Sequence, residues 1–122
     1  MRALLLAGAW LYATAIVFLS LMPKPPDPGF AYGDKLGHLA AYSLLMFWFC
    51  WLYRRQTVRL GYAALWFAMG IALEFAQGAT GYRSFEIEDM LANTLGVFVG
   101  WLAAKLLRGR GPDIETSGAS TE

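Results

Sequence analysis

Residues 60–77 read LGYAALWFAMGIALEFAQ, and this stretch decides the fold. Residues 60–73 carry no charge, and a single carboxylate, Glu74, follows directly. A spanning helix needs about 20 mostly apolar residues. An ionisable group in hydrocarbon costs about 2.5 kcal/mol or more, so it needs a partner or a purpose. The stretch therefore predicts a membrane-spanning helix with one acidic group near its end.

Three further apolar runs surround this one. Residues 3–22 and 90–104 carry no charge, and residues 36–53 contain only His38. Hydrophobic residues make up 57% of the 122-residue chain and charged residues 16%, which is more apolar surface than a soluble domain of this size can bury. We predict an all-α polytopic membrane protein with four transmembrane helices in an antiparallel bundle. The expected spans are approximately 3–22, 34–54, 58–77 and 86–107, in one domain covering 1–108.

The two ends of the chain need separate interpretations. Arg2 followed by an apolar stretch is also how a secretory signal peptide begins. The stretch is long, however, and runs through Ser20 and Met22 into Pro23 without a small-x-small cleavage site, so we expect an uncleaved first span. Residues 23–29 are proline-rich and predict a stiff spacer. Residues 109–122 are rich in Gly, Ser, Thr and Glu and predict a disordered cytoplasmic tail.

The basic residues predict the orientation, because Lys and Arg are retained on the cytoplasmic side during insertion. One side of a four-span arrangement carries Arg2, Arg54, Arg55, Arg59, Lys105, Arg108 and Arg110, and the other carries Lys24, Lys35 and Arg83. Both termini are therefore expected in the cytoplasm. The outer side then gathers the acidic residues Asp27, Asp34, Glu74, Glu86, Glu88 and Asp89. We expect the polar chemistry to lie at this outer face.

Polar residues recur at helical spacing in three of the predicted spans, and residues three or four apart share a helix face. The second span carries Asp34, His38 and Tyr42 on one face, with Lys35 beside them. The third ends in Glu74 and Gln77, which are expected to continue a stripe formed by Ala64, Ala68 and Ala72. The fourth opens with Asp89 and Asn93, followed by Gly96 and Gly100. The two glycines have the small-x-x-x-small spacing that favours close helix packing.

This order of motifs resembles the VanZ family of small membrane proteins, named for an accessory determinant of resistance to the glycopeptide teicoplanin. The family's Asp-Lys-x-x-His and later Tyr are matched by Asp34, Lys35, His38 and Tyr42, its Glu-x-x-Gln by Glu74 and Gln77, and its later Arg, Asp, Asn and Gly by Arg83, Asp89, Asn93 and Gly96. The resemblance covers roughly residues 19–107. It implies a multi-pass protein of the bacterial cytoplasmic membrane, and it implies little about activity.

Each motif also has a purely structural interpretation. Asp34 and Ser84 can cap the helices that follow them. Acidic residues in the first turns of the fourth span are favoured by the helix dipole, and Arg83 could simply neutralise them. Gln77 and Asn93 can bond across helices, a contribution of ~0.6 kcal/mol each. Taken singly, these residues therefore indicate structure as readily as function.

Together the polar residues exceed what four short helices need to associate, and intramembrane ionisable groups indicate function by default. The predicted ligand-binding residues are Asp34, Lys35, His38, Tyr42, Glu74, Gln77, Arg83, Asp89 and Asn93. The first hypothesis is a module that binds the polar head of a cell-envelope amphiphile or contributes to lipoglycopeptide resistance. In it, Lys35 and Arg83 meet a phosphate or carboxylate of the ligand.

Two further hypotheses remain open. In an enzyme acting on a lipid-linked envelope substrate, His38, Glu74 and Asp89 are the candidate catalytic acid, base or metal ligands. The sequence contains no Gly-x-Ser-x-Gly and no His-Glu-x-x-His motif. In a structural subunit of a membrane complex, Gly96 and Gly100 would pack helices or pair two copies. We predict no cofactor and no resident metal, membrane lipids as partners, a possible homo-oligomer, and no nucleic-acid binding, since the basic residues form no patch.

Overall fold

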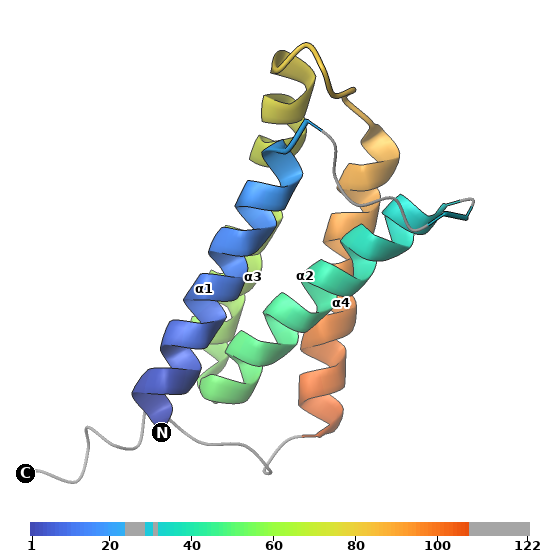
Figure 1. The fold of residues 1–122 in the computed structure, drawn as a ribbon. Coiled ribbons are helices and arrows are strands. Elements are labelled where there is room, and N and C mark those ends of the chain that lie inside the picture. The colour runs from blue at the N-terminus through green and yellow to red at the C-terminus, as the bar shows by residue number, and fades with distance from the viewer. Residues whose placement is uncertain (24–28, 31, 108–122) are drawn as a thin grey trace, which may run out of the picture.

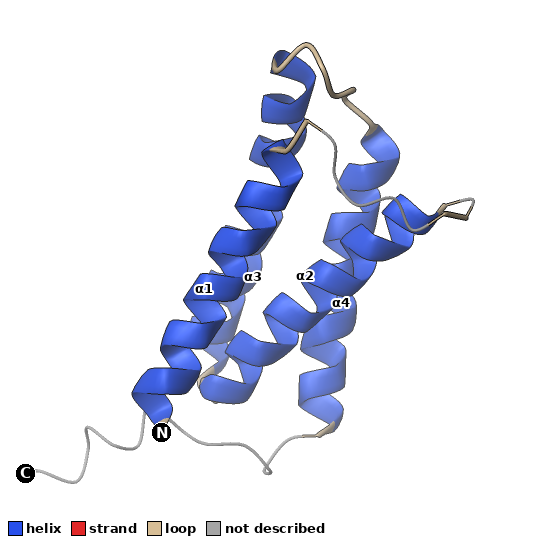
Figure 2. Cartoon of the chain, in the orientation of Figure 1, coloured by secondary structure: helices blue, strands red, loops and turns tan. Residues whose placement is uncertain are grey.

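The computed structural model describes residues 1–23, 29–30 and 32–107, and the regular elements in that part of the chain are all α-helices. They are α1 (Arg2–Leu21), α2 (Gly33–Leu52), α3 (Gln56–Ala79) and α4 (Ile87–Leu106), arranged as an elongated bundle (Figure 1, Figure 2). The predicted all-α class with four helices is confirmed. Most of the expected proline-rich spacer and the whole expected tail, residues 109–122, lie outside the described residues.

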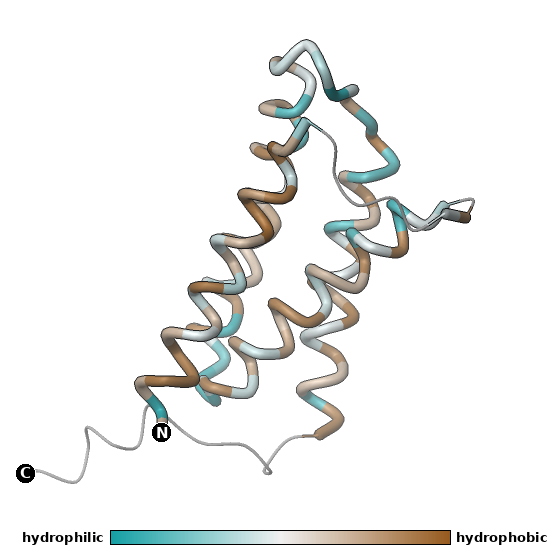
Figure 3. Tube along the Cα trace, viewed as in Figure 1, coloured by the Kyte–Doolittle hydropathy of each residue, from teal (hydrophilic) through white to brown (hydrophobic). Residues whose placement is uncertain are grey.

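Two of the four helices, α1 and α3, are long and apolar enough by themselves to cross a membrane. Helices α2 and α4 have the same 20-residue length as α1, about 30 Å, but each carries charged residues in its first turn. Figure 3 shows hydrophilic residues gathered where α2 and α4 begin. The prediction of four spanning helices is therefore supported for two helices of the described chain.

Helices α2 and α4 form the closest pair, because two glycines of α4 lie directly against the α2 backbone. A Cβ atom at Gly96 would lie 2.6 Å from the carbonyl oxygen of Leu39, and one at Gly100 would lie 2.2 Å from that of Ser43. Neither position can accept a side chain without moving the helices apart. Gly96 and Gly100 thus pack within the chain, so this glycine face is not open to a second copy.

The buried face of α3 differs from the expected one. Its deeply buried members are Arg59, Trp66, Gly70, Glu74 and Gln77. The stripe of Ala64, Ala68 and Ala72 is instead exposed, and the expectation that it continues the face of Glu74 is wrong. Ala72 and Glu74 are two residues apart, which is about 200° around a helix, so they lie on nearly opposite sides.

The interior at the far end from Glu74 is aromatic. The Phe49 ring lies 5.3 Å from the Trp10 ring, 4.5 Å from Tyr62 and 5.0 Å from Trp66, measured between centroids. Below these rings, buried Arg59 donates from Nη2 to the Cys50 carbonyl oxygen and from Nε to that of Tyr53, both at 2.6 Å. These carbonyls lie at the end of α2, where helices have no internal donors left. Arg59 is therefore a cap for α2 as well as a topology signal.

Candidate functional site

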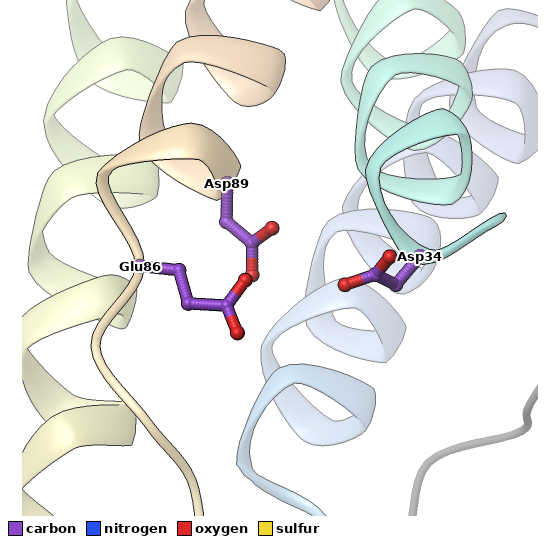
Figure 4. A group of neighbouring side chains, drawn as sticks. All are labelled: Asp34, Glu86 and Asp89. Atoms are coloured by element: carbon purple, nitrogen blue, oxygen red, sulfur yellow. The ribbon is translucent and has the colours of Figure 1, made fainter. Parts of the chain in front are cut away.

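The first turns of α2 and α4 face each other at one end of the bundle, with Lys35 between them. Its Nζ lies 3.0 Å from Asp34 Oδ2 and 3.0 Å from Asp89 Oδ1, and it also donates to Glu86 Oε2. Glu88 Oε2 is 3.9 Å away. Figure 4 shows the carboxylates of Asp34, Glu86 and Asp89 converging from the two chain segments. We call these five residues the Lys35 cluster.

The acids of the Lys35 cluster differ in depth. Asp34 and Glu88 have largely exposed side chains, whereas the Asp89 side chain is 7% exposed. Asp89 Oδ1 has Lys35 as its ion-pair partner but receives no well-directed hydrogen bond. A buried carboxylate without its cation is strongly disfavoured. Asp89 is therefore the acid that depends most on Lys35.

His38 lies one turn further along α2 and connects Asp89 to Asn93. Its Nδ1 lies 2.9 Å from Asn93 Oδ1, and its Nε2 lies 3.6 Å from Asp89 Oδ2. An amide oxygen only accepts hydrogen bonds, so the Nδ1 of His38 is the donor in the bond with Asn93. The ring is thereby oriented with Nε2 toward the Asp89 carboxylate.

Glu74 reaches the same region from α3. It is 1% exposed, and its Oε1 accepts the backbone N–H of Glu86 at 2.6 Å. The residue before α4 is Glu86, so Glu74 binds the chain where α4 begins. Its carboxyl group faces the N-terminal end of α4, where the helix dipole favours a negative charge. Glu74 thus ties α3 to the Lys35 cluster.

The two helix caps of the structural interpretation, Asp34 and Ser84, are not formed. Tyr32 precedes α2, so Asp34 lies inside the first turn, and neither α2 nor α4 has a side-chain cap. Ser84 donates to Glu86 Oε1 at 3.3 Å instead of capping α4. The structure thereby assigns Asp34 to the Lys35 cluster.

Tyr42 lies deeper in the bundle, below His38. It is 1% exposed, and its hydroxyl has no hydrogen-bond partner among the described residues. Its ring lies 3.5 Å from where a Cβ of Gly70 would be. Tyr42 therefore presents an unpaired polar atom in the interior between α2, α3 and α4.

Gln77 and Arg83 lie elsewhere. Gln77 Nε2 donates to the Ser20 carbonyl oxygen at 2.7 Å, and Arg83 Nη1 donates to those of Ser20 and Met22 at 3.2 and 3.0 Å. Tyr82 donates its hydroxyl to the Leu21 carbonyl oxygen at 2.8 Å. These bonds cap the C-terminal end of α1. Of the nine predicted ligand-binding residues, Gln77 and Arg83 are thus the two outside the region around the Lys35 cluster.

The sequence profile of the VanZ/LLP1 family matches residues 6–108. The chain belongs to the VanZ/LLP1 family. It is also similar to an uncharacterized protein of Schizosaccharomyces pombe, with 32% identity over 82 residues, 65% of this chain and 49% of the relative. The chain therefore spans about half the length of that relative. No solved structure matches this VanZ/LLP1 chain.

An open pocket of about 670 Å³ lies at the Lys35 cluster of this VanZ/LLP1 protein. It is lined by Tyr32, Asp34, Lys35, Phe85, Glu86, Ile87 and Glu88. Aromatic and aliphatic side chains thus stand beside charged ones, a combination that suits an amphiphile. The deeper groups Glu74, His38 and Asn93 adjoin this pocket through Asp89 and Glu86.

Three acids of the Lys35 cluster also have the spacing of a metal site. Ligand oxygens of Asp34, Glu86 and Asp89 lie within 4.8 Å of one another, and carboxylates are ligands that hard cations prefer. The Lys35 ammonium already lies among these oxygens, so a metal ion would compete with it. The expectation of no resident metal stays a prediction.

Five residues that line the pocket of the VanZ/LLP1 protein are missing from the set predicted from its sequence: Tyr32, Phe85, Glu86, Ile87 and Glu88. Glu86 and Glu88 read there only as outer-side acids near a helix N-terminus. The spacing of Glu86 from Asp89, three residues, could have indicated a shared face. No local signal in the sequence pairs either residue with Lys35, which is about 50 positions away.

Proposed function

We propose that this VanZ/LLP1 protein is a multi-pass membrane protein that binds the polar head of a cell-envelope amphiphile at the Lys35 cluster. The observation that carries the proposal is the charge balance around one ammonium. Asp34, Glu86, Glu88 and Asp89 surround Lys35, and buried Glu74 adjoins them. The acids outnumber the cations even when His38 is charged. The pocket, which Tyr32 and Phe85 help to line, opens beside these carboxylates.

Four spanning helices are the arrangement that best accommodates these charges. Helices α2 and α4 have the length of α1, and their charged first turns lie together at one end of the bundle. Arg54, Arg55 and Lys105 lie toward the other end, which is therefore assigned to the cytoplasm. The Lys35 cluster then faces the outer side of a bacterial cytoplasmic membrane.

The charge balance also indicates which head group the site selects. Lys35 is already bound by carboxylates, and Arg83 lies at the end of α1. Neither is placed in the pocket as an open phosphate-binding cation, as the sequence hypothesis required. An excess of acids favours amine- or hydroxyl-bearing head groups, which donate hydrogen bonds to carboxylates. A lipoglycopeptide with an acyl chain, such as teicoplanin, is one amphiphile that the test should include.

The test is native mass spectrometry of the protein released from membranes in mild detergent. Wild type is compared with Glu74→Gln and Asp89→Asn, which keep shape and remove one charge each, and with Arg54→Ala at the opposite end as control. We expect one defined amphiphile on wild type and on Arg54→Ala, and at least a tenfold loss on both acid variants. Equal retention by all four proteins, each still folded, would overturn the proposal.

A second candidate, acid–base chemistry on the same amphiphile, has one observation in its favour. His38 is oriented between Asn93 and Asp89, at 2.9 and 3.6 Å, as a proton-transferring histidine would be. In this case, incubation with envelope lipid extract yields a product of altered mass with wild type. His38→Gln should still retain the amphiphile but form no product. Product formation by His38→Gln would eliminate this candidate.

A further inference from the structure

A second, apolar groove runs between α1 and α3, on helices that take little part in the Lys35 cluster. It has a volume of about 410 Å³ and is lined by Trp10, Ala13, Thr14, Val17, Leu65, Trp66, Ala68, Met69 and Ala72. The one hydroxyl in this lining, on Thr14, donates to the Trp10 carbonyl oxygen of its own helix. The indole N–H groups of Trp10 and Trp66 are the other polar side-chain groups of the lining, so the groove wall is mostly apolar.

The shape of the groove favours a flexible chain over a helix. From Trp10 to Val17 it extends about 10 Å along α1 at 1.5 Å per residue. The small side chains of Ala68 and Ala72 line the part of the groove nearer the C-terminal ends of α1 and α3. Trp10 and Leu65, each more than 40% exposed, line the part nearer the N-terminal ends of these helices. Two packed helices need axes 8–10 Å apart, which these two bulky residues oppose. An acyl chain fits beside them.

The cationic side chain of Arg83 lies beyond the end of the groove that is nearer the C-terminal end of α1. Ser20 follows Val17 by three residues on the same face of α1, and its carbonyl oxygen accepts from Arg83 Nη1 at 3.2 Å. That nitrogen also donates to the Met22 carbonyl oxygen. A guanidinium has five N–H donors, and the hydrogen bonds that the Arg83 guanidinium makes to described residues both use the Nη1 nitrogen. Among the described residues, Nε and Nη2 of this partly exposed side chain have no hydrogen-bond acceptor, and the inference below uses these donors for an anion.

We infer that the α1–α3 groove and Arg83 together bind one anionic phospholipid of the surrounding bilayer, with an acyl chain in the groove and the phosphate at Arg83. Tyr82, which caps α1 beside Arg83 and is 53% exposed, lies at the level where a head group would be. Aromatic residues favour that zone of a bilayer. The inference rests on the membrane placement proposed above but not on a ligand at the Lys35 cluster.

The test uses the full-length protein in nanodiscs containing equal amounts of phosphatidylglycerol and phosphatidylcholine, followed by native mass spectrometry of what stays bound after release. Ala68→Phe fills the groove, and Ala40→Phe, at an exposed alanine of α2 outside the groove, is its control. Arg83→Gln removes the charge, and Arg83→Lys keeps it.

We expect wild type and Ala40→Phe to retain one phosphatidylglycerol, and Ala68→Phe to retain at least tenfold less. Arg83→Gln should bring the ratio of the two lipids close to one, and Arg83→Lys should keep most of the preference. Equal retention by Ala68→Phe and Ala40→Phe would overturn the inference. So would a wild-type dimer that Ala68→Phe converts to monomer, since the groove would then hold a second copy. Glu74→Gln should leave phosphatidylglycerol retention unchanged, which separates this site from the proposed function.

Discussion

Helices α2 and α4 meet backbone to backbone, whereas α1 and α3 part around a groove, although both pairs carry small residues four positions apart. In α4, Gly96 and Gly100 face carbonyl oxygens of α2 at distances that no Cβ can occupy. In α3, Ala68 and Ala72 line the groove with α1. Small residues at this spacing permit close approach, but the rotation of each helix decides whether a partner is there.

The polar contacts of the two pairs differ in the same way. The α2–α4 pair is joined by side chains that meet side chains, as Lys35 meets Asp89 and His38 meets Asn93. The α1–α3 pair is joined at its end by side chains that meet backbone carbonyls, as Gln77 meets Ser20. The bond of Gln77 to Ser20 joins two neutral groups, whereas the acids around Lys35 exceed their cations. This difference is why we place recognition of the amphiphile head group on the α2–α4 pair.

The largest expected effect tests whether the glycine contact holds the bundle together. Gly100→Val places a side chain where the first carbon alone would lie 2.2 Å from the Ser43 carbonyl oxygen. The helices must separate, and we expect a loss of about 3 kcal/mol or more in the free energy of unfolding. The measurement is unfolding by denaturing detergent, followed by circular dichroism.

The matched control for that variant is Ala68→Val, which places the same valine side chain on the exposed face of α3. We expect this change to lie within about 0.5 kcal/mol of wild type. Equal destabilisation by the two variants would contradict the difference in packing between the α2–α4 pair and the α1–α3 pair.

The next largest effect concerns the charges that join α2 and α4. Lys35→Met removes the ammonium that Asp34, Glu86 and Asp89 share, and we expect a loss of about 1–2 kcal/mol, since Lys35 is only partly buried. The loss should shrink as salt is raised, because repulsion between partly exposed acids is screened. Lys35→Arg should recover most of the stability. A penalty that is independent of salt would show that Lys35 acts by packing.

A smaller effect is expected where α1 and α3 meet. Gln77→Leu removes the 2.7 Å bond to the Ser20 carbonyl oxygen, but Arg83 still donates to that atom. We expect a loss of about 1 kcal/mol, the usual net value of one hydrogen bond. Gln56→Leu, at the exposed start of α3, is the control. A larger loss of unfolding free energy than that of Lys35→Met would show that the polar contacts of α1 and α3 stabilise the protein more than those of α2 and α4.

The smallest effect sharpens the assignment of the ligand. Tyr42→Phe removes a buried hydroxyl that has no hydrogen-bond partner among the described residues, so stability should stay within about 0.5 kcal/mol of wild type or rise slightly. Native mass spectrometry of the same variant reports whether the hydroxyl meets the amphiphile. A loss of more than about 1 kcal/mol in stability would show that the hydroxyl is satisfied in the folded protein.

Several site residues could be found from sequence because they repeat along a helix. Asp34 and His38 share a face at a spacing of four, as do Asp89 and Asn93, and the structure brings the four residues together with Lys35. The same reasoning placed Ala72 with Glu74, which is wrong because two residues correspond to more than half a turn. The family resemblance grouped Arg83 with the acids, whereas Arg83 donates to the carbonyls at the end of α1.

The sequence by itself determined the helical class, the number of helices and the end of the bundle that carries the acids. These follow from apolar runs, helical period and charge, which are local properties of the chain. Only the tertiary structure decided which donor meets which acceptor: Lys35 with the acids before and within α4, Glu74 with the Glu86 N–H, and Arg59 with the end of α2. It also decided that α4 packs on α2 through its glycines while the alanines of α3 stay exposed. Such pairings depend on how each helix is rotated about its axis, and that rotation is set by packing between segments far apart in the chain.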